Sequence, residues 1–510
     1  MQTNPEVIGI GEAPATETRL PQALPVLAAA LMLGALGDGL LRATPWGVNL
    51  VFCAAALAFS ATVLARHMGP ERARVRMRIF APAVLLAAGC AWRDSAILKS
   101  LDFVGMLLAL ALAAWHAEGG KLIMASVTGC VRVAWNTTMR TLFGAPGLVF
   151  FDVALTRLPG RAWQHAARGV IGILIALPLL LVFGALFASA DAMFDRLILS
   201  LFDIDFTVVI SHVFLCALLA ALAGGYLRGL LLRQSPDAPP HLVESGIRLG
   251  NIEAGVVLGC LNVLFLTFIS VQFRYFFGGT EPVHVVPGLT YAAYAREGFF
   301  QLVTVAALVL PVLLAMDWLA RHEARKAALR WLSGALVAML FVIMASAFQR
   351  MRLYQCEYGL TELRFYTTVF MGWLAAVCVW FSVTVLRGRR ERFVFGALVA
   401  GLVAVFALHV VNPDALIIRV NAARVSAGHT FDADYATSLS ADAVPALLKA
   451  LPKLRPWDRY GVVAELRKKW LNKLGDWRNW NWACAAARRK IREHVAAAAE
   501  QSRQLSGEPR

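Results

Sequence analysis

Long apolar stretches separated by short, arginine-rich loops are the feature that most constrains how this chain folds. Most stretches are close to the roughly 20 residues that an α-helix needs to cross a hydrocarbon core of about 30 Å. We expect spans at 22–41, 46–65, 79–92, 98–116, 167–190, 207–228, 252–273, 298–320, 329–349, 365–386 and 393–412. The sequence therefore predicts an all-α fold, a polytopic transmembrane helical bundle of about eleven spans.

The composition supports residence in a lipid bilayer. Hydrophobic residues make up 59% of the 510 residues and charged residues 16%, which is too little charge to cover a water-soluble protein. The net charge of +16 is concentrated in short loops beside apolar stretches, so it indicates membrane orientation rather than nucleic-acid binding. The eight cysteines lack CxxC spacing. We expect no metal site, disulfide framework or cofactor.

Lysine and arginine also predict which side each loop occupies. Loops 66–78, 321–330 and 387–392, together with the segment 117–166, carry most of these residues, and all fall on one side if the spans alternate. Because lysine and arginine accumulate in cytoplasmic loops, the N-terminus is predicted to be cytoplasmic and the C-terminus extracytoplasmic.

The pattern divides the chain into six regions. They are a cytoplasmic N-terminal tail (1–21), N-terminal transmembrane helices (22–116), cytoplasmic interfacial helices (117–166), the main transmembrane bundle (167–412), an extracytoplasmic helical C-terminal region (413–500) and a disordered tail (501–510). In the C-terminal region Ser440 is a candidate helix cap. Five tryptophans there either pack a core, lie at the headgroup layer, or form a surface for an anionic ligand: Trp457, Trp470, Trp477, Trp480 and Trp482.

Polar residues beside the spans are the candidate functional groups. If a helix begins near Glu357, then Glu357, Thr361 and Arg364 lie on one face of it. They would form either a structural ion pair or a site for a zwitterionic or anionic ligand. The predicted outer cluster also includes the neighbouring hydroxyls and the entrance to the eighth span: Tyr358, Tyr366, Tyr291, Tyr294, Arg296 and Glu297.

The seventh span carries a second polar group inside the membrane: Asn251, Glu253, Asn262 and Gln272. Buried amides commonly join helices through hydrogen bonds. A polar path for protons or a solute is the alternative. Three isolated ionisable residues near span ends are expected to reach the interface or to be paired: Asp38, Asp317 and His409.

Several segments resemble a bacterial multi-pass membrane family. LNVLFLTFISVQFRYFFGG, TYAAYAREGFFQL, EYGLTELRFY, NPDALI and DWRNWNW are similar to the domain of unknown function numbered 4173, which is related to the one numbered 4153. The similarity runs from about Leu177 to Trp482. It implies a helical protein of the bacterial inner membrane and supplies no reaction.

No catalytic motif is recognisable, so three functions compete. The first is a structural or signalling membrane component that acts through a membrane or periplasmic protein partner, with the C-terminal region as its interaction surface. The second is a transporter of a small or lipid-like solute, and the third is an intramembrane transferase acting on a lipid-linked substrate.

Overall fold

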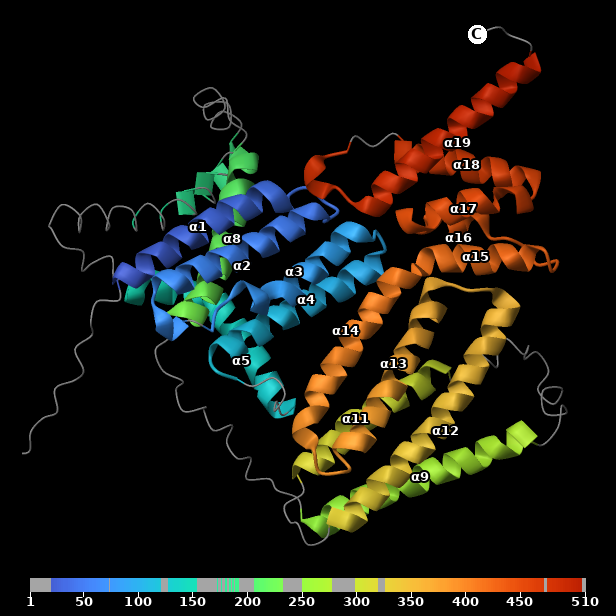
Figure 1. Ribbon diagram of the computed structural model, residues 1–510, viewed down its shortest axis with the longest axis horizontal. Helices are drawn as coiled ribbons and strands as arrows, with labels where there is room; N and C mark the ends of the chain where they lie inside the picture. Colours follow the sequence, from blue (N-terminus) through green and yellow to red (C-terminus); the bar gives the residue numbers. More distant parts are fainter. Residues whose placement is uncertain are drawn as a thin grey trace, which may run out of the picture.

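The computed structural model describes residues 20–72, 74–120, 127–153, scattered positions within 172–191, and residues 206–232, 250–277, 299–319, 326–471 and 475–506. All regular elements among these residues are helices (Figure 1). Nine of the described helices are long and apolar enough to cross a membrane, and a tenth apolar helix is shorter. The predicted all-α polytopic bundle is confirmed.

The N-terminal helices form one packed group with its own core. They are α1 (Leu20–Leu41), α2 (Val48–His67), α3 (Met77–Trp92), α4 (Ala96–Ala117), α5 (Val127–Gly147) and α8 (Phe206–Leu231). Helix α1 lies along both α8 and α2, while α3 packs between α2 and α4. Phe80, Leu227 and Leu231 are at most 1% exposed in this core. Small residues let these helices approach closely, as in other membrane bundles.

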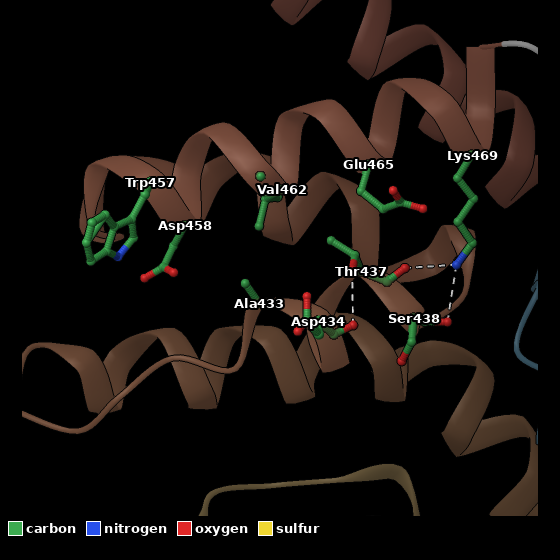
Figure 2. A pocket seen from close by; sticks show the side chains of 10 residues that line it. Ala433, Asp434, Thr437, Ser438, Trp457, Asp458, Val462, Glu465 and Lys469 are labelled. Atoms are coloured by element: carbon green, nitrogen blue, oxygen red, sulfur yellow. Dashed lines mark hydrogen bonds between the residues drawn. The ribbon is translucent and has the colours of Figure 1, made fainter.

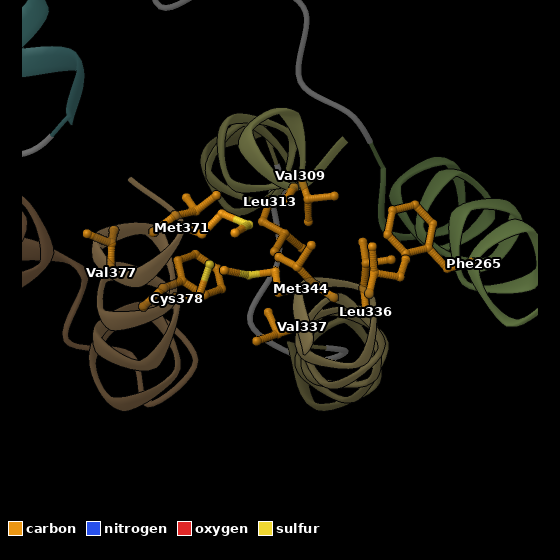
Figure 3. Packing of buried hydrophobic residues seen from close by; sticks show 14 of the residues in the cluster. Phe265, Val309, Leu313, Leu336, Val337, Met344, Met371, Val377 and Cys378 are labelled. Carbon is orange, nitrogen blue, oxygen red and sulfur yellow. The ribbon is translucent and has the colours of Figure 1, made fainter. Parts of the chain in front are cut away.

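The second group surrounds the largest buried cluster. Its helices are α9 (Asn251–Phe277), α11 (Phe299–Leu319), α12 (Lys326–Tyr358), α13 (Glu362–Thr384) and α14 (Phe393–Val411). Figure 3 shows Phe265 of α9, Leu313 of α11, Met344 of α12 and Cys378 of α13 directed toward one another. Helix α14 packs against α13 and also against α4, so it joins the two groups.

The spans leave most of their apolar surface uncovered by protein. Only 17–39% of the residues in the span windows are buried, and Phe59, Leu85 and Phe406 are 64–70% exposed. A water-soluble protein rarely exposes apolar surface on this scale. Lipid is therefore the medium in which these faces are stable.

Residues 413–506 form a compact helical unit, here named the cap. It contains α15 (Pro413–Val425), α16 (Ala433–Ser438), α17 (Val444–Ala450), α18 (Pro456–Leu471) and α19 (Trp482–Ser506), with a short 3-10 turn, η8 (Ala441–Ala443). Ile417, Leu447 and Leu466 are at most 2% exposed in its core. Figure 1 shows the cap beyond the ends of α3, α4, α13 and α14.

The chain enters the cap through a sharp corner at Asn412. Asn412 adopts the left-handed conformation, with φ 55°, and its side-chain oxygen accepts a hydrogen bond from the Ala415 amide at 3.2 Å. Asparagine tolerates this conformation better than most residues. Pro413 then occupies the first turn of α15, where its missing N–H costs no hydrogen bond.

The structure corrects several predicted boundaries. Ten predicted spans coincide with α1–α4, α8, α9 and α11–α14, whereas 167–190 lies largely outside the described residues. Packing crosses the predicted division at residue 116, because α8 packs on α1 and α5. Helix α19 runs to Ser506, so the predicted disordered tail is too long: the alanine-rich end has high helix propensity. Ser440 is confirmed as a cap, accepting from the Asp442 amide.

The segment 117–166 contains α5, which crosses α8 at close range through glycines. A Cβ added at Gly225 of α8 would lie 2.3 Å from the backbone oxygen of Thr141, and one at Gly144 of α5 would lie 2.8 Å from the Gly225 Cα. A partly buried, hydrogen-bonded ion pair between Arg228 and Asp152 lies beside the same contact. The close approach of the two backbones therefore depends on the absence of side chains at these positions.

The Gly225→Ala substitution is expected to push α5 away from α8. Overpacking of this kind costs about 1–3 kcal/mol, so the melting temperature in detergent should fall. Gly259→Ala is the matched control, because a Cβ at Gly259 meets nothing within 4 Å. Equal melting temperatures for the two variants would contradict the close contact.

Candidate functional site

A polar cluster joins the cap to the bundle where the α3–α4 turn meets η8. We name it the junction: Arg93, Asp94 and Ser95 of the turn, His409 of α14, and Ser440 and Asp442 of the cap. The guanidinium of Arg93 donates to the backbone oxygen of His409 from Nε at 2.8 Å and also from Nη2. Its Nη1 donates to Asp442 Oδ1 at 3.0 Å. One side chain thus ties α3, α14 and the cap together.

Asp442 binds the backbone of the α3–α4 turn immediately before α4. Ser95 precedes α4 but makes no side-chain capping bond. Instead Asp442 Oδ2 accepts hydrogen bonds from the backbone amides of Asp94 at 2.6 Å and Ser95 at 3.3 Å. A carboxylate at a helix N-terminus satisfies free N–H groups and favourably opposes the helix dipole. Asp442 is 4% exposed, so few water molecules can replace these bonds.

The contact is reciprocal. Asp94 Oδ2 accepts from the backbone amide of Ala441 in η8 at 3.2 Å, and its Oδ1 accepts from Lys99 Nζ at 2.8 Å. Asn481 of the cap donates from its side-chain amide to the backbone oxygens of Cys90 and Arg93, both at 2.8 Å. Cap residues therefore form hydrogen bonds both with the end of α3 and with the turn that leads into α4.

Inside the bundle, next to the junction, a buried histidine faces a buried aspartate. His409 Nε2 lies 3.0 Å from Asp102 Oδ2, and the two residues are 4% and 1% exposed. Because His409 Nδ1 lies 2.9 Å from the Val405 backbone oxygen, which only accepts, Nδ1 carries a hydrogen. The bond to Asp102 then requires one further proton between Nε2 and Oδ2. Gly89 makes room, since a Cβ there would lie 2.7 Å from both groups.

Other cap contacts hold the neighbouring bundle turns. Asn421 of α15 exchanges two hydrogen bonds of 2.8 Å with the backbone of Leu360, between α12 and α13. Tyr435 Oη accepts from the Glu362 amide at 2.8 Å. At the α1–α2 turn, the Val48 amide donates to the Trp480 backbone oxygen at 3.0 Å. The cap therefore contacts the bundle at three separate turns.

The predicted outer cluster is only partly assembled. The helix expected to begin near Glu357 is wrong: α12 continues to Tyr358 and α13 begins at Glu362, with Thr361 between them. Glu357 and Arg364 are therefore on different helices, and the single face proposed for them does not exist. Gly359, with φ 76°, makes the turn that periodicity does not reveal.

Arg364 and Tyr366 nevertheless have defined roles. The Arg364 guanidinium donates to the backbone oxygen of Gly359 at 2.6 Å and lies 4.0 Å from the Tyr354 ring centroid, so it satisfies the end of α12. Tyr366 Oη lies 3.2 Å from Ser95 Oγ, which connects α13 to the junction. Tyr291, Tyr294, Arg296 and Glu297 lie outside the described residues.

The amides of α9 hold helices together. Asn262 donates to the backbone oxygens of Leu258 at 2.7 Å and of Leu332 on α12 at 3.1 Å. Gln272 accepts from Ser346 Oγ at 2.9 Å. Both contacts have the form of interhelical bonds. Glu253 is exposed in the first turn of α9, and Asn251 begins that helix.

The three isolated ionisable residues are all paired. Asp38 accepts from Arg42 Nε at 2.7 Å and lies 2.6 Å from His212 Nδ1. Asp317 lies 3.7 Å from Arg390, and His409 contacts Asp102. The partner of His409 was missed because the two residues are 307 positions apart in the sequence; an aspartate within the apolar stretch 98–116 was the available signal.

An acidic cleft opens in the cap between α16 and α18 (Figure 2). It has a volume of about 870 Å³ and is lined by Asp434, Asp458 and Glu465, with Trp457 at one end. Lys469 lies at the other end but donates to the backbone oxygens of Thr437, Ser438 and Leu439 at 2.9–3.2 Å. Its charge therefore completes the C-terminus of α16.

The cap tryptophans do not form one core. Trp470 is 8% exposed, whereas Trp457, Trp477, Trp480 and Trp482 are 44–74% exposed. The Trp477 ring lies 6.5 Å from that of Phe52 on α2, so this end of the cap borders the spans. Side chains of this kind favour the membrane–water interface.

Asp414, beside the junction, is expected to make stability depend on pH. Burial, together with the carboxylates of Glu362 and Asp442, raises the pKa of Asp414 from 3.8 to about 6, although Ser440 donates to it. A raised carboxyl pKa favours the protonated folded state, so stability falls as pH rises between about 4 and 6. The free energy of unfolding should fall by about 1 kcal/mol between pH 5 and pH 7.

The measurement is thermal unfolding of the full chain at those two pH values. Asp414→Asn should remove this part of the pH dependence, because the amide does not titrate. An unchanged dependence in Asp414→Asn would assign the effect to another group.

Among the described residues, no group of three or more histidine, cysteine, aspartate or glutamate side chains could hold a metal ion.

No curated protein and no solved structure matches the chain. A family model described as a domain of unknown function, DUF4153, matches residues 80–450, a range that includes the bundle from α3 onward and the cap through α17. Both sides of the junction lie inside it. Of the two related families suggested by the sequence motifs, 4173 and 4153, the match shows the second, and the chain belongs to the DUF4153 family.

Proposed function

We propose that this protein is a structural or signalling component of a bacterial inner membrane that acts through a protein partner, with the cap as the docking surface. The observation that carries the proposal is the set of hydrogen bonds that Asp442 accepts from Arg93 and from the backbone of the α3–α4 turn. A displacement of the cap would leave the amides of Asp94 and Ser95, which lead into α4, without these acceptors. A rigid, multi-point attachment of this kind suits a domain that transmits a binding event to the membrane.

The charge distribution supports an extracytoplasmic cap. The cap contacts the α1–α2, α3–α4 and α12–α13 turns. Loops 66–76 and 387–392 connect the other ends of these helices, and they carry eight arginines: Arg66, Arg72, Arg74, Arg76, Arg387, Arg389, Arg390 and Arg392. By the positive-inside rule these loops are cytoplasmic.

The cleft and the junction are connected through a short segment. Lys469 of the cleft holds the backbone of residues 437–439. Three residues after Leu439, Asp442 binds Arg93 and the Asp94 amide in the α3–α4 turn. A partner seated between α16 and α18 would contact the same segment that supplies the junction. The acidic lining favours a partner with a basic surface, and Trp457 offers an aromatic anchor of the kind found at interfaces.

The test is co-purification of full-length protein in lipid nanodiscs, followed by mass spectrometry of bound proteins. Glu465→Lys is expected to lose a stoichiometric companion that the unaltered protein retains, with an unchanged melting temperature. Glu493→Lys on α19 is the matched control, since Glu493 is also exposed and lies outside the cleft. The proposal would be contradicted if no protein partner co-purified, or if Glu465→Lys retained the partner.

A proton-coupled transporter is the second candidate, favoured by the Asp102–His409 pair. Ionisable residues inside a membrane are costly and often belong to ion or proton pathways. Asp102 Oδ1 is buried and has no hydrogen-bond partner in the part of the chain that the structure describes. Proteoliposomes with an internal pH indicator test this function. Proton flux lost in Asp102→Asn would favour it, and equal flux in both proteins would oppose it.

A further inference from the structure

A second cavity lies at the end of the bundle opposite the cap. It has a volume of about 240 Å³ and opens among α9, α11, α12 and α13. Its floor is apolar and belongs to the main buried core: Leu258, Leu313 and Phe381 are each 1% exposed. A cavity of about 150 Å³ with such walls suffices to hold benzene. The space can therefore accept part of a hydrocarbon chain.

The rim of this cavity is polar and carries positive charge. Arg330 of α12 and Arg390 of the α13–α14 loop line it, together with Ser333 and Asp317. Arg390 is 58% exposed and lies 3.7 Å from Asp317, a distance that leaves its guanidinium only loosely held. The loop 387–392 holds four arginines against one glutamate. An anion is thus the complementary charge at this mouth.

The surroundings are those of a membrane surface. Trp331, next to Arg330, is 81% exposed, and Ile252 and Val256 of α9 are 70% and 58% exposed. Tryptophan at such a position marks the headgroup layer. Apolar side chains on the outside of α9 then face acyl chains. A ligand that enters the cavity from the bilayer keeps its charged group at the arginines.

We propose that this cavity is a binding site for an anionic phospholipid, with the phosphate held by Arg330 and Arg390 and the start of one acyl chain inserted toward Leu258 and Phe381. A soluble phosphate would not use the apolar floor, and an uncharged apolar solute would not use the arginines. Guanidinium groups bind phosphate through paired, charge-assisted hydrogen bonds. The arginine rim together with the apolar floor therefore favours a molecule that has both a phosphate group and an acyl chain.

The experiment is titration of the detergent-purified full chain with phosphatidylglycerol, read by native mass spectrometry. The double variant Arg330→Gln/Arg390→Gln should bind about ten-fold more weakly or worse. Arg389→Gln, in the same loop but outside the cavity lining, should stay within about two-fold of the unaltered protein. Ser333→Leu, which fills the cavity without removing charge, should weaken binding by about ten-fold.

Further comparisons distinguish binding of the whole lipid from binding of its phosphate group alone and from non-specific charge attraction. Glycerol phosphate, which has the headgroup without chains, should bind at least about ten-fold more weakly than the lipid. Equal losses for Arg389→Gln and the double variant would show non-specific surface attraction and overturn the site. Unchanged binding in Ser333→Leu, with a normal melting temperature, would also overturn it. Equal binding of glycerol phosphate would show a simple phosphate site instead.

Discussion

Replacing Asp442 with alanine is expected to release the cap from the bundle. The change removes the acceptor of Arg93 Nη1 and of the Asp94 and Ser95 amides at once, and it leaves the guanidinium without its carboxylate partner. Breaking a buried ion pair from one side costs about 3–5 kcal/mol, and each lost hydrogen bond to the backbone adds about 1 kcal/mol. In nanodiscs, limited proteolysis should cleave near the corner at Asn412 in the variant and spare the unaltered protein.

Glu493→Ala is the control for this prediction. Glu493 pairs with Lys490 at 2.7 Å, but its side chain is 53% exposed, and exposed pairs contribute little to stability. Its protease pattern should therefore match that of the unaltered protein. If Asp442→Ala were equally resistant, the junction would not be what holds the cap.

Removing one member of the Asp102–His409 pair is expected to have the second large effect. Asp102→Leu leaves a buried imidazole without its acceptor, and His409→Leu leaves a buried carboxyl group without its donor. Each single change should lower the free energy of unfolding by about 3–5 kcal/mol. The measurement is thermal or denaturant-induced unfolding in detergent, following the full chain.

The double variant Asp102→Leu/His409→Leu supplies the comparison. Replacing both members of a buried pair by apolar residues is often neutral, so its stability should exceed that of either single variant. Its coupling energy is obtained from the double-mutant cycle. Additive losses would mean that the two groups do not interact. A stable double variant without biological activity would show that the pair is retained for function.

The helical architecture was predictable because the bilayer imposes it locally. A span must satisfy its own backbone hydrogen bonds and present apolar side chains over a fixed length. Both conditions are met within about 20 consecutive residues, so no distant contact is needed to recognise 98–116 or 393–412 as helices. The boundaries were harder to predict: α12 runs past its apolar part to Tyr358, where Arg364 and Arg424 donate to its terminal carbonyls.

The candidate site, too, was predictable only in part from the sequence. Tyr366 was predicted to be functional from its position at a span end, and it does reach the junction. Glu357 was predicted from helical spacing, and that spacing failed when Gly359 broke the helix. Asp442 and Arg93 drew no attention, because a charged residue in a loop is ordinary until its burial is known.

The sequence by itself determined the fold class, most spans, the helical nature of the C-terminal region and the segregation of arginine to alternate loops. Each of these follows from properties of neighbouring residues. Only the tertiary structure decided that residues 347 to 349 positions apart, in the α3–α4 turn and in η8, bind each other. It likewise decided that His409 meets Asp102. Such contacts depend on how helices cross and where the cap settles, because burial and hydrogen bonding are properties of the assembled chain.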